Sequence, residues 1–337
     1  MTPRVSIVLV NWNGLHHLEK CLPALGAQTF PDFEIFLVDN GSTDGSTEWV
    51  RGHYPQVRLI CNDHNTGFAV ANNQAMRQSQ AEFIVTLNND TQVEPTWLAA
   101  LVAVAETDPS VGMVASKMLF TQQPEVINST GIALDPVGIA WDRQGGTLDD
   151  PNEEQPIEVF GPCAGAALYR RAMLDQIGLF DEAFFAYAED VDLAWRARWA
   201  GWRCLYVPAA RVHHDHSATG GEGSPFKSRL LGRNKVWLIA KNYGPLGRLL
   251  LYLPLIVVYD LAAVVYALVV RRDVYTLVGR LEGLAGLPQM WRKRAAIVGT
   301  AESSPWYHHL EPLVSPWQVA RRYRHLRSLV PKQGHGS

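Results

Sequence analysis

Short apolar segments alternate with amphipathic ones along the first 120 residues of the chain. The apolar segments are rich in β-branched residues, which favour strands, and lie at 5–10, 33–38, 57–61, 83–87 and 112–116. Between them apolar residues recur at helical spacing, at 15–25, 47–53, 68–78 and 96–106. Strands that alternate with helices over short connections predict a Rossmann-like α/β fold, with a mostly parallel sheet and helices on both faces.

The pattern changes after residue 120. Residues 121–158 are rich in Pro, Gly, Asp and Asn, and we interpret them as a substrate-side insertion of irregular loops and short strands. A regular pattern then returns. It predicts a strand at 164–169, helices at 171–177 and 189–200, and a last strand at 204–207. Residues 212–224 are rich in His and Gly and are expected to form a loop.

An apolar stretch of different character occupies residues 249–270. It contains one charge, Asp260, and one proline, Pro254, and arginines flank it on both sides. About 20 apolar residues suffice to cross a bilayer, and basic residues nearby favour anionic lipids. Two interpretations stay open: a segment that spans, re-enters or lies on a membrane, and a helix or hairpin buried in a core. We expect a catalytic domain at 1–245 and a hydrophobic, basic helical tail at 246–337 that contacts the membrane.

Composition and charge narrow the class of function. The chain has 337 residues and a formal net charge of −3, so no overall positive field attracts nucleic acid and no nucleic-acid partner is expected. The four cysteines show no CxxC spacing, which favours reduced thiols over a zinc site. The first residues carry no secretory signal pattern. We therefore expect the catalytic part at the cytoplasmic face of the cell membrane.

Polar residues follow three of the predicted strands. They are Asn11 and Asn13 after the first strand, Asp39, Ser42 and Asp44 after the second, and Asn88, Asn89 and Asp90 after the fourth. Any one cluster fits ordinary turn chemistry, because Asn, Asp, Gly and Ser are the usual turn formers. Three clusters are harder to explain as turns alone, because the carboxyl ends of parallel strands share one edge of the sheet, where ligands bind.

The ligand at this edge is not predicted to be held by a glycine-rich loop. Neither GxGxxG nor GxxxxGK[ST] follows any predicted strand, which disfavours a dinucleotide dehydrogenase or a P-loop NTPase. A diphosphate can still bind where a metal ion replaces that loop. Asp90 can give one hard oxygen ligand to Mg²⁺ or Mn²⁺, which take one or two protein carboxylates and complete their shell with phosphate oxygens and waters.

Several segments together resemble family 2 glycosyltransferases, which have the GT-A fold, and most closely the bacterial rhamnosyltransferase-like branch. The donor-side segments are VNWN at 10–13, VDNGSTD at 38–44, NTGF at 65–68 with NN at 72–73, and LNND at 87–90. The acceptor-side segments are GPCAGA at 161–166 and YAEDVDLAWR at 187–196. The resemblance covers about residues 5–245, in order and with similar spacing.

The resemblance implies a donor-binding site. Asp39 would hold the nucleobase or ribose with the help of Asn11 and Asn13, and Asn65 and Gly67 would line the donor pocket. The remaining donor-side residues belong to the same motifs and are Ser42, Asp44, Asn72, Asn88 and Asn89.

The resemblance also implies a metal site for Mg²⁺ or Mn²⁺. Asp90 occupies the last position of the family's DXD motif and would bind the metal, whereas Asn88 replaces the first Asp and leaves the metal one carboxylate short. His214 matches a histidine that follows the last strand in relatives and would approach the metal or the diphosphate. From the residues alone, His213, His214 and His216 fit either a metal cluster or a solvated loop.

Asp190 would be the general base, with Glu189 as its neighbour on the acceptor side. One base without a nucleophile predicts a single displacement with inversion at C1. A glycosidase-like pair is disfavoured, because adjacent helical residues diverge by about 100° and rarely flank one bond. The alternative for both carboxylates is helix capping, since acidic residues at a helix start complement its dipole.

We therefore expect an inverting glycosyltransferase of cell-surface polysaccharide synthesis. It would move a sugar from a nucleoside-diphosphate donor, with dTDP-rhamnose as a candidate, to a glycan or lipid-linked acceptor. The alternative is a nucleotide-sugar-binding protein without transfer activity, against which the intact Asp190 argues. A nucleotidyltransferase on a related fold would need a basic glycine-rich signature after the first strand, which residues 11–14 lack.

Overall fold

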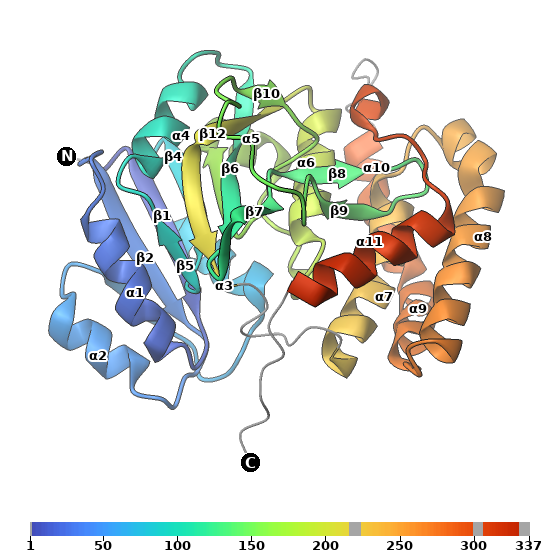
Figure 1. The fold of residues 1–337 in the computed structure, drawn as a ribbon, viewed down its shortest axis with the longest axis horizontal. Coiled ribbons are helices and arrows are strands. Elements are labelled where there is room, and N and C mark those ends of the chain that lie inside the picture. Colours follow the sequence, from blue (N-terminus) through green and yellow to red (C-terminus); the bar gives the residue numbers. More distant parts are fainter. Residues whose placement is uncertain (1, 216–223, 299–305, 330–337) are drawn as a thin grey trace. The chain divides into compact units, whose positions relative to one another are not determined.

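The computed structural model describes residues 2–215, 224–298 and 306–329 (Figure 1). The chain divides into two compact units. The first comprises residues 1–132 and 142–216, and the second comprises residues 133–141 and 217–337.

A sheet of ten strands forms the centre of the first unit, in the order β10-β12-β6-β11-β4-β1-β2-β3, with β5 beside β12 and β7 beside β6. The strands are β1 (Val5–Asn11), β2 (Phe33–Asp39), β3 (Arg58–Cys61), β4 (Phe83–Asn88), β5 (Thr91–Val93), β6 (Val111–Phe120), β7 (Gln123–Ser129), β10 (Ile157–Glu158), β11 (Ala166–Arg170) and β12 (Arg203–His214). The block β4-β1-β2-β3 is parallel, as expected. The sheet as a whole is mixed, because β11 lies antiparallel between β4 and β6.

Helices cover both faces of this sheet, which confirms the predicted α/β architecture. They are α1 (Leu15–Gly26), α2 (Ser46–His53), α3 (Phe68–Gln78), α4 (Trp97–Ala105), α5 (Arg171–Ile177) and α6 (Glu189–Trp199), with a short 3₁₀ turn, η1 (Glu182–Phe184). The connections through α1 and α2 step in one direction across the sheet, whereas α3 leads back over β2 and β1 to β4. Since such connections are right-handed, the reversal places α3 on the opposite face.

The apolar side chains of these strands form the core of the first unit. Val5, Ile7 and Leu9 of β1 are fully buried, and Trp97 of α4 is fully buried beside β6, where its indole N–H donates to Ser116 Oγ at 2.9 Å. The strands of the parallel block read as nearly continuous hydrophobic runs because both faces of the sheet are covered.

The last strand is longer than its apolar pattern predicts, and the expected loop from residue 212 is wrong at its start. Val212 pairs with Val93 and His214 with Thr91, so β5 extends β12 as far as His214. His214 therefore has a fixed place in the sheet. Residues 216–223, with His216, lie outside the described part of the chain.

Helices make up most of the second unit. They are α7 (Pro225–Asn242), α8 (Leu246–Val269), α9 (Tyr275–Ala285), α10 (Leu287–Val298) and α11 (Pro316–Leu329), with a 3₁₀ turn, η2 (Trp306–His309). A two-stranded sheet of β8 (Ile132–Leu134) and β9 (Ala140–Asp142) lies at the division between the units.

Glycines let α7 and α9 pack closely in the second unit. A Cβ at Gly279 would come within 2.9 Å of the Arg229 carbonyl carbon, and a Cβ at Gly232 would lie 2.8 Å from the Thr276 carbonyl oxygen. This packing groups α7 with the helices that follow it. The division between the units consequently falls at residue 216, before the domain boundary expected at 245.

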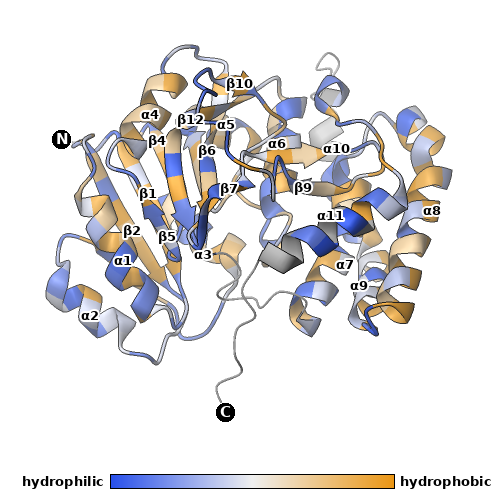
Figure 2. Cartoon of the chain, in the orientation of Figure 1, coloured by the Kyte–Doolittle hydropathy of each residue, from blue (hydrophilic) through white to orange (hydrophobic). Residues whose placement is uncertain are grey.

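Helix α8 is the most apolar element of the second unit, and Figure 2 draws it mostly in the hydrophobic colour. By length and composition it is the one helix in the described part of the chain that could cross a membrane. Only 17% of its apolar window is buried against the rest of the protein.

Candidate active site

The polar residues expected at one sheet edge do meet there, within the first unit. Asn11 ends β1 opposite Asp39 at the end of β2, and Asn88 ends β4 opposite Val10. Asn11 Nδ2 donates to Asp39 Oδ1 at 2.9 Å, and Asn89 Nδ2 donates to Asn11 Oδ1 at 2.7 Å. Asn11 thus links the ends of two strands and the turn after β4 into one hydrogen-bonded edge.

The loop after β2 is fixed by Ser42 and Asp39. Ser42 N donates to Asp39 Oδ2 at 2.8 Å, and Ser42 Oγ accepts from Asn13 N at 2.8 Å and from Asn11 Nδ2 at 3.1 Å. Asn13 Oδ1 accepts from Thr43 N at 2.8 Å, which ties the β1 and β2 loops together. The two expected donor-side loops therefore form one pre-organised wall.

Asp44 has a structural part in that wall. Its Oδ2 accepts from Leu15 N at 2.8 Å at the start of α1, and its Oδ1 accepts from Ser46 N at 3.1 Å at the start of α2. A carboxylate that accepts backbone N–H groups at helix starts satisfies donors that the helix leaves free. Asp44 thus positions the first turns of both helices beside the donor-side edge.

The segment before α3 contributes Asn65 and Gly67. Asn65 Oδ1 accepts from Gly67 N at 2.9 Å and from Asn40 Nδ2 at 3.3 Å. Gly67 has φ +88°, and a Cβ there would lie 2.6 Å from the Phe185 ring. Glycine at this position therefore allows the NTGF turn to pack directly on the segment that precedes α6.

Asn72 is almost fully buried in α3, where its Nδ2 donates to Phe68 O at 2.9 Å. Its Oδ1 is buried and lacks a hydrogen-bond partner among the described residues. The neighbouring Asn73 joins α3 to the segment between α5 and η1, because its amide donates to Phe180 O at 2.9 Å and accepts from Phe180 N at 3.1 Å.

Asp90 and His214 form a buried pair beside Asn88. His214 Nε2 lies 3.2 Å from Asp90 Oδ1 and 3.5 Å from Asn88 Nδ2. Burial opposes ionisation of Asp90, yet His214 and His17 outweigh it and lower the pKa of Asp90. Burial likewise opposes the charged imidazolium of His214, but the carboxylates around it, led by Asp90, raise its pKa.

Sequence reasoning missed Asn128, which orients His214. The Nδ1 atom of His214 lies 2.8 Å from Asn128 Oδ1. A histidine ligand usually has its second ring nitrogen held in this way, which directs the first toward the metal. Asn128 is the penultimate residue of β7, within the irregular insertion, where no motif marks it.

The residues at this place fit a divalent ion that arrives with a diphosphate. Within the described residues there is no group of three or more His, Cys, Asp or Glu side chains that could hold an ion by themselves. An ion bound to a nucleotide requires only one or two protein carboxylates, because phosphate oxygens and waters fill the other positions. Asp90, with its lowered pKa, and His214, held by Asn128, meet that requirement.

Asp190 and Glu189 open α6, and backbone N–H groups hold the Asp190 carboxylate. Ala164 N donates to Asp190 Oδ2 at 3.1 Å, and Val191 N donates to Oδ1 at 2.8 Å. Burial raises the pKa of Asp190 to about 6. Burial also raises the pKa of Glu189, and the Asp190 charge raises it further. Burial thus raises the pKa of both carboxyl groups at the start of α6.

The backbone before α6 is strained. Phe185, Tyr187 and Ala188 have φ values of +68°, +67° and +67°, which non-glycine residues rarely adopt. Strain of this kind persists where the surrounding structure enforces it, and it concentrates at functional sites.

Asp142 is a second residue that sequence reasoning missed. Its charge raises the pKa of both Asp190 and His214, which places it close to the acidic pair and to the histidine. Asp142 ends β9 inside the expected substrate-side insertion. The charge of this one residue of the insertion therefore acts on both Asp190 and His214.

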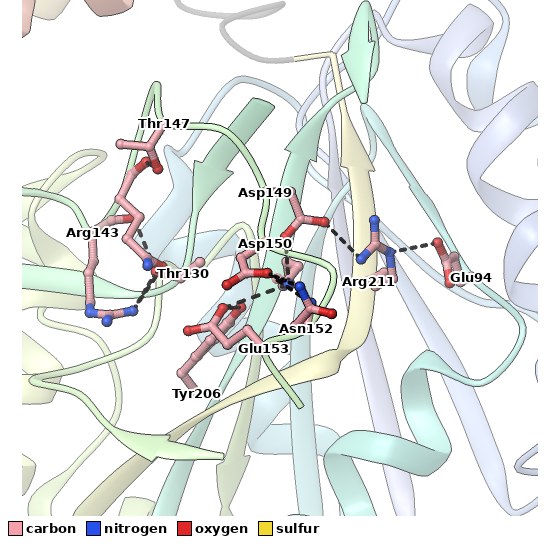
Figure 3. A network of polar contacts seen from close by, with 12 residues as sticks. Glu94, Thr130, Arg143, Thr147, Asp149, Asp150, Asn152, Glu153, Tyr206 and Arg211 are labelled. Atoms are coloured by element: carbon pink, nitrogen blue, oxygen red, sulfur yellow. Dashed lines mark hydrogen bonds and ion pairs between the residues drawn. The ribbon is translucent and has the colours of Figure 1, made fainter. Parts of the chain in front are cut away.

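A polar network fastens the insertion to the sheet (Figure 3). Asp149 accepts from Lys117 Nζ at 2.6 Å and from Arg211 at 3.0 Å, and Tyr206 OH donates to Glu153 at 2.9 Å. Lys117 is only 1% exposed, so its charge is neutralised inside the protein. The insertion that contributes Asn128 and Asp142 is thus held in a defined position.

Known proteins show the same combination of fold and sequence. The profile of glycosyl transferase family 2 matches residues 6–178. The N-acetylglucosaminyl-diphospho-decaprenol L-rhamnosyltransferase of Mycobacterium tuberculosis (strain ATCC 25618 / H37Rv) is 31% identical over 247 residues, which cover 65% of this chain and 79% of that protein. The O-antigen biosynthesis protein RfbC of Myxococcus xanthus is 31% identical over 231 residues, but this chain covers only 18% of it.

Solved structures show the same fold at lower identity. The mannosyltransferase PcManGT from Pyrobaculum calidifontis, in complex with GDP-Man and Mn²⁺, has a TM-score of 0.52 and 19% identity, over 98% of this chain and 84% of that one. GalNAc-T7 with UDP, GalNAc and Mn²⁺ has a TM-score of 0.56 and 18% identity, over 71% of this chain and 50% of that one.

The fold and the family match define the chain as a glycosyltransferase with a GT-A-type catalytic unit. It belongs to glycosyl transferase family 2, and its relatives support the rhamnosyltransferase-like branch of that family.

Proposed function

We propose that the first unit transfers a sugar from a nucleoside-diphosphate donor with inversion at C1, and that Asp190 is the general base. The observation that carries the proposal is the environment of Asp190, a half-buried residue whose carboxylate is held by two backbone N–H groups and has a pKa of about 6. A general base works best when its pKa lies near the working pH, where it is ionised and can still accept a proton.

The transfer is a single displacement. An acceptor hydroxyl oxygen attacks C1 of the sugar and forms the new C1–O bond while the bond from C1 to the diphosphate oxygen breaks. Asp190 accepts the hydroxyl proton, and the nucleoside diphosphate leaves with the bonding electron pair. The donor-side edge of Asn11, Asp39, Asn65 and Gly67 would hold the nucleotide, and one base without a second nucleophile gives inversion.

Asp90 and His214 would hold a divalent ion, Mg²⁺ or Mn²⁺, at the diphosphate. When bound, such an ion stabilises the negative charge that develops on the leaving diphosphate. The buried Asp90–His214 pair and the oriented His214 ring support this assignment. The named complexes of the two structural relatives contain Mn²⁺, which supports the same class of ion here.

The names of the relatives support a proposal for the donor and for the acceptor class. The rhamnosyltransferase of M. tuberculosis acts, by its name, on an N-acetylglucosaminyl-diphospho-decaprenol, and the M. xanthus relative is an O-antigen biosynthesis protein. We therefore propose dTDP-rhamnose as the first donor to test, and a lipid-linked glycan of cell-surface polysaccharide synthesis as the acceptor class. The presence of Asp190, the proposed base, argues against the alternative of nucleotide-sugar binding without transfer.

We also propose that α8 brings the enzyme to the cytoplasmic face of the cell membrane. Its exposed large apolar side chains are Leu246, Leu250, Leu251, Leu253, Val257, Val258, Leu261, Val265, Leu268 and Val269. Its one acidic side chain is neutralised within the second unit, where Asp260 pairs with Lys235 at 3.0 Å and with Arg280 at 2.7 Å. A large apolar patch exposed on a protein surface marks an interaction site. Because the proposed acceptor is linked to a lipid, we propose that this patch contacts the membrane.

A nucleotide panel tests the donor site. Thermal unfolding is followed with dTDP, UDP, GDP, CDP and ADP, each with and without Mg²⁺ or Mn²⁺. A ligand at 100 times its dissociation constant stabilises the folded state by about 2.7 kcal/mol, which raises the unfolding temperature measurably. A metal-dependent rise with one base supports the proposal and identifies the donor class. No rise with any nucleotide contradicts it.

A further inference from the structure

A second carboxylate lies next to Asp90, at the end of the sheet where Asn88 replaces the first Asp of DXD. Antiparallel pairing of β5 with β12 continues one step beyond the strands, because Asp215 N donates to Asp90 O at 2.9 Å. This bond brings the backbones of Asp215 and Asp90 side by side where the two strands end.

His17 of α1 faces Asp215 from the other side. Its Nδ1 lies 3.6 Å from Asp215 Oδ2, and its side chain is 11% exposed. This Nδ1 atom and Asp215 Oδ1 are both buried, and neither has a hydrogen-bond partner in the described part of the protein. Two buried polar atoms without partners at one place are costly, and they indicate a group that completes the site when it binds.

Two pairs of an imidazole and a carboxylate meet at this place. His214 Nε2 lies 3.2 Å from Asp90 Oδ1, and His17 Nδ1 lies 3.6 Å from Asp215 Oδ2. The backbone bond between Asp215 and Asp90 joins the two pairs. A divalent ion with a diphosphate takes one or two protein carboxylates, and Asp90 alone supplies the first.

We propose that Asp215 supplies, through a metal-bound water, the carboxylate that Asn88 no longer provides, and that His17 is a positioning residue that orients Asp215. This proposal rests on the proposed function, since it assumes that Asp90 binds the divalent ion. His17 Nδ1 faces Oδ2 of this carboxylate at 3.6 Å, which leaves Oδ1 available to the hydrated cation. The metal site of this chain is then built from β4, β12 and α1 instead of from one DXD segment.

Mn²⁺ binding tests the proposal by electron paramagnetic resonance, which measures free Mn²⁺ directly and needs no catalysis. Wild type is titrated with Mn²⁺ alone and with each of dTDP, UDP, GDP, CDP and ADP. Asp215→Asn should weaken Mn²⁺ binding about tenfold or more, and His17→Gln should weaken it by a similar factor, as loss of residues that orient a ligand usually does. The unfolding temperatures of the variants show whether they fold.

Glu19→Gln is the matched control for charge, because Glu19 is an exposed carboxylate on the same helix as His17. It should leave Mn²⁺ binding unchanged. The double variant Asn88→Asp/Asp215→Asn should regain affinity, because it returns the missing carboxylate to the DXD position.

Each outcome decides the matter. Weakening by Asp215→Asn with recovery in the double variant supports the proposal. Mn²⁺ binding in wild type that Asp215→Asn reduces no more than Glu19→Gln does overturns the proposal and leaves the metal role of Asp90 intact. Absence of Mn²⁺ binding in wild type with every nucleotide contradicts both the proposal and the metal-dependent function on which it rests. If Asp215→Asn does not fold, His17→Gln decides by the same criterion.

Discussion

The backbone N–H of Ala164 donates to the carboxylate of Asp190 at 3.1 Å. This bond joins the segment GPCAGA to the start of α6, although 26 residues separate the two positions. It holds Asp190 in one orientation while burial raises the pKa of this carboxyl to about 6. The account of catalysis depends on that combination of fixed geometry and shifted pKa.

The pH dependence of transfer should report the Asp190 titration. The base must be ionised, so kcat/KM should rise about tenfold per pH unit below pH 6 and level off above about pH 7. Initial rates between pH 5 and pH 8, with donor at low concentration, measure the inflection.

Asp142→Asn is the companion variant for that profile. The Asp142 charge contributes to the raised pKa of Asp190, so its removal should move the inflection to lower pH. An inflection that stays in place would show that the profile reports another group.

The ion pair of Asp192 and Arg196 should contribute to stability far more than an exposed pair. Arg196 Nε lies 2.9 Å from Asp192 Oδ2, and the guanidinium also donates to Ile177 O and Leu179 O at 2.7 Å. Asp192 is fully buried, so Asp192→Ala leaves a buried charge without its partner and should cost about 3–5 kcal/mol of unfolding free energy.

Denaturant unfolding measures this cost. Glu48→Ala, which removes one side of the exposed pair with Arg51, should leave the unfolding midpoint almost unchanged. Equal effects of the two substitutions would mean that the buried pair is not what stabilises α6.

Alanine substitutions at two glycines distinguish the energetic cost of backbone strain from the cost of steric overlap. Gly67 has φ +88° and ψ 171°, and Gly178 has φ +80° and ψ 166°, so alanine is strained equally at both. A Cβ at Gly178 meets no described atom within 4 Å, whereas a Cβ at Gly67 lies 2.6 Å from the Phe185 ring.

Gly178→Ala should therefore cost about 1–3 kcal/mol from strain alone. Gly67→Ala should cost a further ~1–3 kcal/mol from overpacking. Equal unfolding free energies for the two variants would show that the NTGF turn does not need its close contact with the segment before α6.

Membrane contact through α8 should be lost when its exposed face becomes polar. Leu251, Val258 and Val265 lie at seven-residue intervals on one side of the helix and are 75%, 57% and 58% exposed. Full-length protein should float with anionic lipid vesicles, and the triple variant to asparagine should not, because each apolar side chain in lipid contributes about 1.5–3 kcal/mol. Leu148→Asn, at an exposed leucine of the first unit, is the control and should float as wild type does. Flotation of the triple variant would contradict the assignment of this face to lipid.

The donor-side edge could be predicted from the sequence because its geometry follows from parallel strands. Asn11, Asp39 and Asn88 each end a strand of the parallel block, and parallel strands end at the same edge. The local pattern of each strand therefore sufficed to bring these residues together.

Asn128 and Asp142 could not be predicted in this way. They lie in the insertion of short strands, whose path depends on long-range contacts such as Asp149 with Lys117 and Arg211. The end of β12 could not be predicted from the local sequence pattern either. His214 belongs to a strand because the three-residue strand β5 pairs with it, and so short a strand leaves no periodic pattern in the sequence.

The most direct test of the account compares donor binding with transfer in Asp190→Asn. Donor binding is measured by the nucleotide-dependent rise in unfolding temperature, and transfer by release of nucleoside diphosphate from the donor in the presence of acceptor lipid. The account predicts that Asp190→Asn binds the nucleotide as wild type does and loses transfer by at least ~100-fold, whereas Asp32→Asn, at an exposed carboxylate, retains both. Transfer by Asp190→Asn at the wild-type rate, or equal loss of binding and transfer, would contradict the assignment of Asp190 as the base.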